Sequence, residues 1–400
     1  MIKIAIIGCG QRSFGLYNAF TFRKRAQVVA ICDIYRDKAE TLVGLIVEKG
    51  GEAPAIYESY KDLFEKETLD AVVIATSWKE HIDICLYAMK RGIPVGCEVA
   101  GAYTEEQLWR LIDCYEDTKT PIMMLENCCF GRMELLALNM KRLGLLGEIV
   151  HCECGYRHDL REEISNGRKI RHYRLDQYIH RNADNYPTHG IGPVAKLLDI
   201  NAGNKFLTIS STASKAVGLK DYIQRKFADN EELTGAKFNQ GDVITSVIRC
   251  ENGETITMNL DTTLPRYYSR GFYVQGTRGM LEENNQSVFL DDMYKEEVHY
   301  KWNQHYKNVG EYYEKYDHEL WKGYTPEKFD THGGMDSLMA ASFIDALVNN
   351  KPMPIDVYDM ATWMIITALS ERSIALGGLP VAFPDFTRGA YITGKNNFLK

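Results

Sequence analysis

The feature that most constrains the fold is a short apolar run that leads directly into a glycine pair. Residues 2–7 (IKIAII) predict a buried strand, and Gly8 and Gly10 follow it, with Ser13 in the third small position of a G-x-G-x-x-S loop. In such a loop the first glycine makes a tight turn, and the second lets the backbone approach a pyrophosphate. The anion would then rest on the N-terminus of the next helix. The start of the chain therefore predicts a dinucleotide-binding loop.

A second apolar run, residues 28–33, ends in Asp33, twenty residues after Ser13. A carboxylate at this place accepts hydrogen bonds from the adenosine ribose and repels a 2′-phosphate. We therefore expect NAD rather than NADP, although Arg36 nearby leaves NADP open. The alternative is that Asp33 only caps the helix expected over residues 36–45.

The first 125 residues alternate short apolar runs with helical patterns, which predicts a parallel sheet wrapped by helices. Further strands are expected over residues 70–76, 93–97 and 121–125, with an amphipathic helix over 104–118. We expect a Rossmann domain over residues 1–125.

Three side chains follow the carboxyl ends of the third and fourth strands: Trp78, His81 and Glu98. Ligands of open α/β sheets bind beyond these strand ends, so all three are expected near the cofactor. The alternative for His81 is a place at the start of a helix without any ligand contact.

Residues 126–400 are expected to form a second, α+β domain with a large, mostly antiparallel open sheet and helices on one side. Asn252-Gly253, between apolar runs, is the strongest hairpin signal in the chain. The remaining strands and helices of this domain are expected over residues 148–156, 242–249, 255–260, 272–274 and 280–282, and over 132–143, 191–198, 335–349 and 361–376.

Composition excludes several classes of partner. A net charge of −7 argues against nucleic acid, and no apolar run approaches the ~20 residues of a membrane span. The ten cysteines include no C-x-x-C pair, so no metal is expected. Their apolar surroundings predict reduced thiols and a cytoplasmic protein.

A turn-rich stretch, residues 181–190 (RNADNYPTHG), places His189 just before an apolar helix. Histidine takes and returns a proton near neutral pH without a large pKa shift. The alternative is that His189 only begins the helix. The polar and aromatic residues expected around the same pocket favour catalysis: Tyr156, His158, Arg174 and Tyr186.

The chain as a whole resembles the Gfo/Idh/MocA oxidoreductase superfamily. Within it, the chain is similar to glycoside hydrolase family 109, the NAD-dependent α-N-acetylgalactosaminidases. The matching segments run in order through both domains: residues 75–81 (ATSWKEH), 97–100 (CEVA), 125–132 (LENCCFGR), 155–161 (GYRHDLR), 186–190 (YPTHG), 263–270 (TLPRYYSR) and 332–336 (HGGMD).

Two positions depart from the ordinary dehydrogenases of this superfamily. Those typically carry Glu-Lys-Pro after the fourth strand and an Asp four residues before the histidine. Here Val99 stands in place of the lysine and Asn185 in place of the aspartate. These replacements weaken an interpretation as a plain alcohol dehydrogenase, and the glycosidase family shares the loss at Val99.

The resemblance implies two sets of site residues beyond Gly8 and Gly10. The implied NAD contacts are Gln11, Arg12, Asp33, Trp78, His81, Glu98, Val99 and Asn127. The implied substrate contacts are Glu126, Tyr156, Arg174, Tyr186, His189 and Tyr268. Arg174 lies in the segment that matches the family least.

The resemblance also implies a reaction. Tightly bound NAD would oxidise the sugar at C3, a base would remove the acidified C2 proton, the aglycone would leave C1, water would add, and C3 would be reduced again. Hydrolysis of an N-acetylgalactosaminide would result without the two carboxylates of direct glycosidases. We assign the 3-hydroxyl proton to His189 and the C2 proton to Tyr156.

Two other functions stay open. One is a conventional NAD-dependent sugar or inositol dehydrogenase, which would accumulate NADH. The other is a non-catalytic protein that senses NAD or a sugar. The open face of the second sheet is a candidate surface for a homo-oligomer.

Overall fold

A computed structural model describes residues 1–100, 102–326 and 331–399 of the chain. It contains two structural units, which we describe separately. The first comprises Met1–Phe130, Tyr324–Ile365 and Asn397–Lys400, and the second comprises Gly131–Gly323 and Ile366–Asn396.

The first unit is built on a six-stranded parallel sheet in the order β3-β2-β1-β4-β5-β6. The strands are β1 (Ile2–Ile7), β2 (Ala26–Cys32), β3 (Ala55–Tyr57), β4 (Ala71–Ile74), β5 (Val95–Cys97) and β6 (Ile122–Met124). This sheet confirms the predicted Rossmann fold. Strand β3 was missed because it is a three-residue edge strand that is not fully buried, so it lacks the continuous apolar run of the others.

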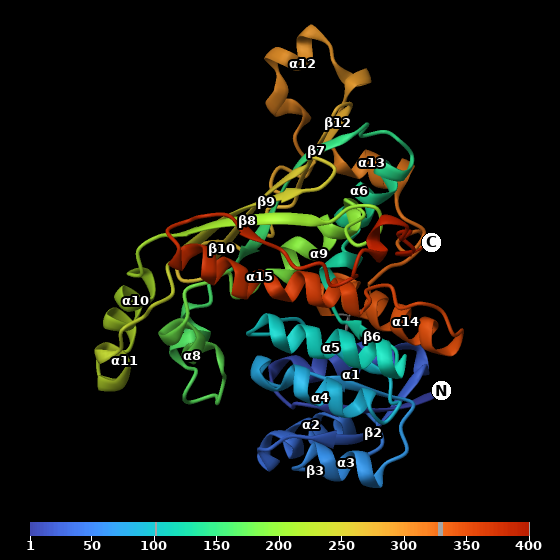
Figure 1. Cartoon of the computed structure of the whole chain (residues 1–400), viewed down its shortest axis with the longest axis vertical. Coiled ribbons are helices and arrows are strands. Elements are labelled where there is room, and N and C mark those ends of the chain that lie inside the picture. Colours follow the sequence, from blue (N-terminus) through green and yellow to red (C-terminus); the bar gives the residue numbers. More distant parts are fainter. Residues whose placement is uncertain (101, 327–330, 400) are drawn as a thin grey trace. The chain divides into compact units, whose positions relative to one another are not determined.

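Helices surround this sheet (Figure 1). They are α1 (Gln11–Thr21), α2 (Arg36–Glu48), α3 (Tyr60–Lys66), α4 (His81–Met89), α5 (Glu105–Thr118) and α14 (Met335–Val348), with α15 (Val357–Ala375) starting in this unit. Short 3₁₀ helices cover Phe22–Lys24, Trp78–Glu80, Asn127–Phe130 and Thr331–Gly334.

Helix α14 lies far along the chain but packs against α1. The rings of Phe20 and Phe343 meet edge to face, with centroids 5.7 Å apart. Residues 324–365, which we expected in the second domain, therefore fold with the first sheet, because the apolar side of α14 finds its core partners on α1. The predicted boundary between the two domains at residue 125 stays a prediction.

The second unit is built on an eight-stranded sheet in the order β13-β12-β11-β7-β10-β9-β8-β14. Only β7 and β10 pair in parallel, so the mostly antiparallel sheet is confirmed. The strands are β7 (Ile149–Arg157), β8 (Phe206–Ala213), β9 (Val243–Cys250), β10 (Thr255–Asp261), β11 (Tyr273–Gly276), β12 (Gly279–Glu282), β13 (Ser287–Leu290) and β14 (Val381–Ala382). Strands β8, β13 and β14 were not predicted.

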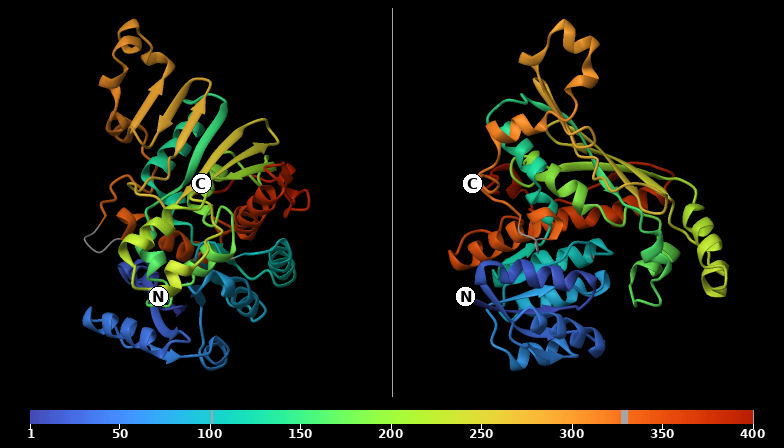
Figure 2. Two further views of the ribbon diagram at one scale, coloured as in Figure 1. Left: turned by 90° about the vertical axis from the view of Figure 1, so that its left-hand side faces the viewer. Right: turned by 180° about the vertical axis from the view of Figure 1, so that it is seen from behind.

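One face of this sheet carries the core of the unit. Ile244 and Ile248 of β9 are buried, whereas Val247 between them is exposed. Helix α9 packs on β7, and α6 packs on α9 (Figure 2). The helices of this unit are α6 (Arg132–Arg142), α7 (Arg161–Ser165), α8 (Arg174–His180), α9 (Thr188–Leu197), α10 (Gly218–Lys226), α11 (Glu231–Gly235), α12 (Glu296–Tyr300) and α13 (Val309–Tyr316), with 3₁₀ turns at Asp291–Met293, Trp302–His305 and Ala390–Ile392.

Two further properties bear on the predictions. All ten cysteines are buried, free thiols. Over the ranges that the structure describes, no helix is long and apolar enough to cross a bilayer.

Candidate active site

The glycine loop of the first unit has the geometry that the sequence predicted. Gly8 has a φ of +100°, and a Cβ there would lie 2.4 Å from the carbonyl oxygen of Ala75, which directly follows the neighbouring strand β4. Gly10 occupies the N-cap of α1 without a side-chain cap, and a Cβ there would meet nothing within 4 Å. The turn therefore needs glycine at position 8, and the N-terminus of α1 opens onto free space at Gly10.

Asp33 follows β2 and braces the same loop. Its carboxylate accepts a hydrogen bond from the amide of Cys9 at 2.7 Å and another from the amide of Tyr35 at 2.8 Å. Helix α2 has Tyr35 at its N-cap, so Asp33 does not cap it. Arg36 forms ion pairs with Glu40 and Glu58 at 2.9 and 3.3 Å. These two carboxylates occupy the guanidinium that could otherwise bind the 2′-phosphate of NADP.

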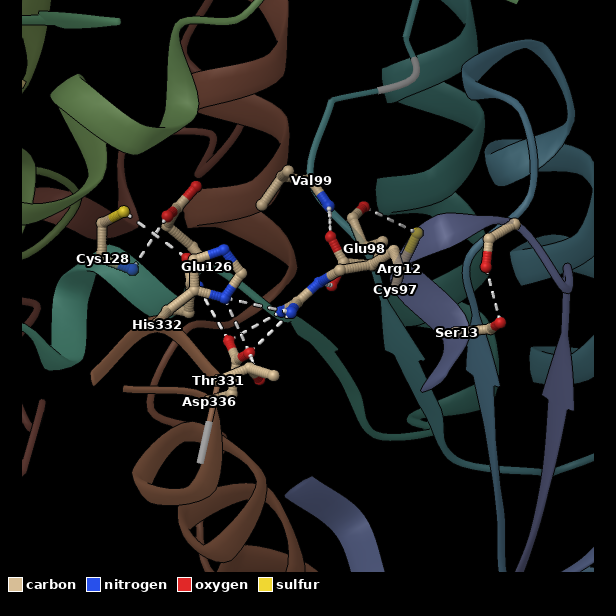
Figure 3. Close-up of polar contacts among 12 residues, drawn as sticks. Arg12, Ser13, Cys97, Glu98, Val99, Glu126, Cys128, Thr331, His332 and Asp336 are labelled. Atoms are coloured by element: carbon tan, nitrogen blue, oxygen red, sulfur yellow. Dashed lines mark hydrogen bonds and ion pairs between the residues drawn. The ribbon is translucent and has the colours of Figure 1, made fainter. Parts of the chain in front are cut away.

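Arg12, two residues after Gly10, lies between two acidic side chains (Figure 3). Its Nε is 2.8 Å from Glu98, which follows β5, and its two terminal nitrogens lie 2.6 and 2.8 Å from the carboxylate of Asp336. Burial lowers the pKa of Arg12, but Glu98 and Asp336 outweigh it and raise that pKa above its ordinary value.

His81 is fully buried at the start of α4. Its Nδ1 lies 2.9 Å from the carbonyl oxygen of Ala100, and its Nε2 lies 3.1 Å from that of Thr76. Burial lowers the pKa of His81, which favours the neutral ring. His81 therefore connects the segments that follow β4 and β5, and a direct cofactor contact stays a prediction.

The remaining predicted cofactor residues lie along the carboxyl edge of the same sheet. Gln11 is exposed in the first turn of α1, and Trp78, Val99 and Asn127 are buried after β4, β5 and β6. The uncapped start of α1, the open space at Gly10 and the carboxylate of Asp33 fit a nicotinamide dinucleotide.

In the second unit, two glycines let the predicted catalytic elements approach each other. A Cβ on Gly190 of α9 would lie 2.6 Å from the amide nitrogen of Gly155 on β7. Their chain neighbours, His189 and Tyr156, therefore lie close, with ring centroids 5.5 Å apart.

Aromatic rings gather around Tyr156. The centroids of Tyr186 and Tyr268 lie 4.5 and 6.1 Å from that of Tyr156, and Tyr186 is 4.8 Å from His189. The phenol oxygen of Tyr156 lies 2.9 Å from Nδ1 of His158. Burial and the charge of Arg174 lower the pKa of His158, which favours the neutral ring, and Nδ1 of a neutral ring protonated at Nε2 can accept the phenol proton.

Arg174 joins this cluster from the start of α8. Its guanidinium lies 5.1 Å from the ring centroid of Tyr186, and its Nε lies 2.8 Å from a carboxylate oxygen of Glu163. Burial lowers the pKa of Arg174, but Tyr173 and Glu163 reverse this effect, so Arg174 stays charged. The structure thus brings together five predicted substrate residues: Tyr156, Arg174, Tyr186, His189 and Tyr268.

The sixth predicted substrate residue, Glu126, belongs to the first unit. It is fully buried after β6, and its carboxylate accepts a hydrogen bond from the amide of Cys128 at 3.1 Å. Its contact with a substrate stays a prediction.

The loop before His189 contains a buried acid, Asp184. It directly precedes Asn185, which stands where dehydrogenases of the superfamily carry an aspartate. Asn185 donates to Gln240 at 2.6 Å. Asp184 is buried and accepts from the amide of Tyr186 at 3.3 Å, and burial raises its pKa to about 7.

Sequence reasoning missed three contributors to these sites. Glu163 and Asp184 carry no local signal, because acids in a helix or a turn are usually solvated. Asp336 belongs to the segment HGGMD, which matches the family, but no site residue was predicted in this segment.

Two family models cover almost the whole chain. Residues 2–125 match the oxidoreductase family with an NAD-binding Rossmann fold, and residues 130–393 match the C-terminal domain of glycosyl hydrolase 109. A glycosyl hydrolase family 109 protein of Parabacteroides distasonis is 38% identical over 99% of this chain and 89% of its own length. The chain belongs to glycosyl hydrolase family 109.

Other relatives agree with this membership. An alpha-N-acetylgalactosaminidase of Tannerella forsythia is 39% identical to this family 109 protein, over 98% of this chain and 87% of its own length. Among solved structures, an Agrobacterium radiobacter oxidoreductase in complex with NAD+ has a TM-score of 0.66 at 16% identity, covering 97% and 99% of the two chains. Myo-inositol 2-dehydrogenase of Lactobacillus plantarum has a TM-score of 0.66 at 15% identity, covering 96% and 99%. These structures confirm the fold, and the family identifies this protein as a glycoside hydrolase with an NAD-binding domain.

Proposed function

We propose that this family 109 protein hydrolyses terminal α-N-acetylgalactosaminides by transient oxidation of the sugar, with tightly bound NAD restored in each turnover. The observation that carries the proposal is the meeting of Tyr156 and His189 where α9 crosses β7. Direct hydrolysis would place two carboxylates about 5–9 Å apart across the bond. Around the Tyr156 ring lie the rings of His158, Tyr186, His189 and Tyr268, residue types that can move protons.

The protein would supply the proton transfers. When bound, NAD would supply reversible hydride transfer at C3 of the sugar. His189 would take the proton of the 3-hydroxyl group and later return it. The residues that would hold the cofactor are those at the glycine loop and at the strand ends: Gly8, Gly10, Gln11, Arg12, Asp33, Trp78, His81, Glu98, Val99 and Asn127.

Tyr156 is suited to proton transfer at C2. Its hydroxyl lies 2.9 Å from Nδ1 of His158, so a neutral His158 with its proton on Nε2 would hold the phenol proton while the phenol oxygen takes the proton from C2. The electron pair of that C–H bond would form a double bond between C1 and C2, and the aglycone would leave with the C1–O pair. Water would then add across the double bond with the same protons returning.

Arg174 would stabilise charge during this step. It is a buried cation held by Glu163 and the face of Tyr186. A fixed cation lowers the energy of an oxyanion that develops next to it, more so where water is excluded. This matches the need of the elimination, in which negative charge develops on the sugar.

The test is hydrolysis of a panel of α- and β-linked chromogenic N-acetylhexosaminides and hexosides, with absorbance recorded at the NADH band. We expect release from the α-N-acetylgalactosaminide without NADH accumulation, and loss of release in His189→Ala and Tyr156→Phe. His299→Ala, on α12, is the matched control. NADH that accumulates with free sugar, without aglycone release, would establish a dehydrogenase instead. No reaction in either channel, with ligand binding unchanged in His189→Ala, would favour a sensing protein.

A second experiment tests the elimination. With a C2-deuterated substrate we expect a primary isotope effect or exchange of the label into solvent, because the C2–H bond breaks. The absence of both would exclude this route while leaving the glycosidase activity intact.

A cytoplasmic location and a homo-oligomer formed through the open sheet face stay predictions. The ten buried free thiols are in keeping with the first.

A further inference from the structure

The segment Thr331–Gly334 forms an unusual turn before α14. His332, Gly333 and Gly334 have φ values of 52°, 64° and 97°, so three consecutive residues have left-handed backbone conformations. For His332 this conformation is strained, and it persists only where the surrounding contacts determine it. The turn places His332 and Asp336 next to each other, and the proposed function assigns no role to either residue.

Asp336, in the first turn of α14, is completely buried and accepts hydrogen bonds from several donors (Figure 3). Two come from Arg12 at 2.6 and 2.8 Å, one from Asn127 at 2.8 Å, and one from His332 at 2.8 Å. The Thr331 hydroxyl is a further partner. A carboxylate offers about four lone-pair sites, so these donors saturate it.

Burial raises the pKa of Asp336, but the bonds from Arg12 and His332 outweigh burial and hold that pKa far below its ordinary value. The carboxylate is therefore charged near neutral pH. A charged, saturated carboxylate is a fixed anchor for the groups that bond to it.

Two of these groups are predicted to contact the cofactor, and they come from opposite parts of the site. Arg12 lies in the glycine loop after β1, whereas Asn127 follows β6 at the edge of the sheet. Arg12 also bonds to Glu98 after β5. One carboxylate from α14 thus connects the glycine loop to the β5–β6 side of the site.

We propose that Asp336 is a positioning residue for the nicotinamide side of the cofactor site: it orients Arg12 and Asn127 toward the dinucleotide without contacting it. This inference rests on the NAD dependence in the proposed function. The sheet order separates the two halves of the ligand, since Asp33 follows β2 on one side of β1, and Glu98 and Asn127 lie on the other. Arg12 lies at the glycine loop between them, so Asp336 acts on the pyrophosphate and nicotinamide and not on the adenosine.

This asymmetry distinguishes positioning from mere stabilisation. A carboxylate that only held α14 on the sheet would affect every ligand of the loop equally. A carboxylate that orients Arg12 and Asn127 affects NAD+ but not adenosine, which contains neither the pyrophosphate expected at the glycine loop nor the nicotinamide half. The core contact of Phe20 with Phe343 also holds α14, so the helix does not depend on Asp336 alone.

The experiment measures equilibrium binding of NAD+ and of adenosine to the full chain, freed of nucleotide, by calorimetry. The variants are Asp336→Asn and, as matched control, Asp359→Asn, which changes another buried aspartate in the first turn of a helix in the same unit. We expect Asp336→Asn to weaken NAD+ binding by roughly tenfold or more and adenosine binding by less than about twofold. Asp359→Asn should leave both unchanged.

Equal weakening of NAD+ and adenosine binding in Asp336→Asn, or no weakening of either, overturns the proposal. If Asp336→Asn does not fold, His332→Ala takes its place. The His332 side chain is half exposed, and its substitution removes only one hydrogen-bond donor to Asp336. Unchanged NAD+ binding in His332→Ala would then overturn it. If the unmodified protein binds no NAD+, the proposed function itself fails, which is a separate result.

Discussion

Gly155 and Gly190 face each other where helix α9 crosses strand β7. Gly155 directly precedes Tyr156, and Gly190 directly follows His189. A Cβ on Gly190 would lie 2.6 Å from the nitrogen and 3.0 Å from the Cα of Gly155, far inside van der Waals contact. The close crossing is what brings the His189 and Tyr156 rings within 5.5 Å of each other.

Gly190→Ala should therefore separate the two catalytic elements. The methyl group must displace backbone, so we expect a loss of roughly 1–3 kcal/mol in the free energy of unfolding. A displacement of about 1 Å at the reacting groups should lower kcat/KM by about 100-fold. Urea unfolding and the chromogenic assay measure both.

Gly310→Ala is the control for this change. Gly310 lies in the first turn of α13, and a Cβ there meets nothing within 4 Å. Alanine is the better helix former by up to about 1 kcal/mol, so this variant should be as stable as the unmodified protein or slightly more so. A Gly190→Ala protein that behaves in the same way would show that the crossing is not tight.

The bond between Tyr156 and His158 predicts the acidic limb of the pH profile. The pKa of His158 is lowered by burial and by Arg174, so Nδ1 still accepts the phenol proton somewhat below the ordinary histidine value of about 6.5. Activity should fall only when His158 becomes protonated at more acidic pH, because Nδ1 then has no free lone pair. The pH dependence of kcat/KM measures this fall.

His158→Gln should lower activity by roughly 10²-fold or more and remove that limb, because its amide does not titrate. If the acidic limb stays at the same pH in His158→Gln, another group is responsible for it.

Asp184 predicts a pH dependence of stability. Burial raises its pKa to about 7, above the value of about 3.9 in an unfolded chain. The folded protein therefore favours the protonated carboxyl, and this contribution is complete below about pH 4 and disappears as the pH rises through about 7. The loss is at most roughly 4 kcal/mol for such a shift.

Asp184→Asn should remove this dependence. The asparagine oxygen can still accept from the amide of Tyr186, and no charge develops. Urea unfolding at pH 5 and pH 8 should show a smaller decrease in stability for Asp184→Asn than for the unmodified protein. Asp221→Asn, at an exposed ion pair with Arg225, is the control and should keep the original decrease.

Asp33 and Arg36 predict the choice between NAD and NADP. Asp33 is held by the amides of Cys9 and Tyr35 at the end of β2, where it would face the adenosine ribose. Asp33→Ala should weaken NAD+ binding by about tenfold and improve binding of NADP+ relative to NAD+. Arg36→Ala should change neither, because Glu40 and Glu58 already occupy its guanidinium. A loss of NAD+ affinity in Arg36→Ala would contradict this assignment.

The chain alone carried the signals for the Rossmann sheet, the glycine loop and the hairpin at Asn252-Gly253, because each depends on neighbouring residues. The stretch around His189 already pointed to a polar and aromatic pocket, the resemblance added Glu126 and Tyr268, and the structure brings five of the six predicted substrate residues to one cluster. Glu163 could not be predicted, since an acid beside an arginine on another helix has no periodic pattern.

What the sequence determined by itself is local: which runs become strands, where the turns need glycine, and which residue types can move protons. What only the tertiary structure decided is which distant residues meet. Asp336 and Arg12 are 324 positions apart, and Gly155 and Gly190 belong to different elements, yet each pair sets the geometry of a site. The physical reason is that such contacts depend on packing the α14 and α9 faces against their partners, which is a property of the whole core and not of any window of the sequence.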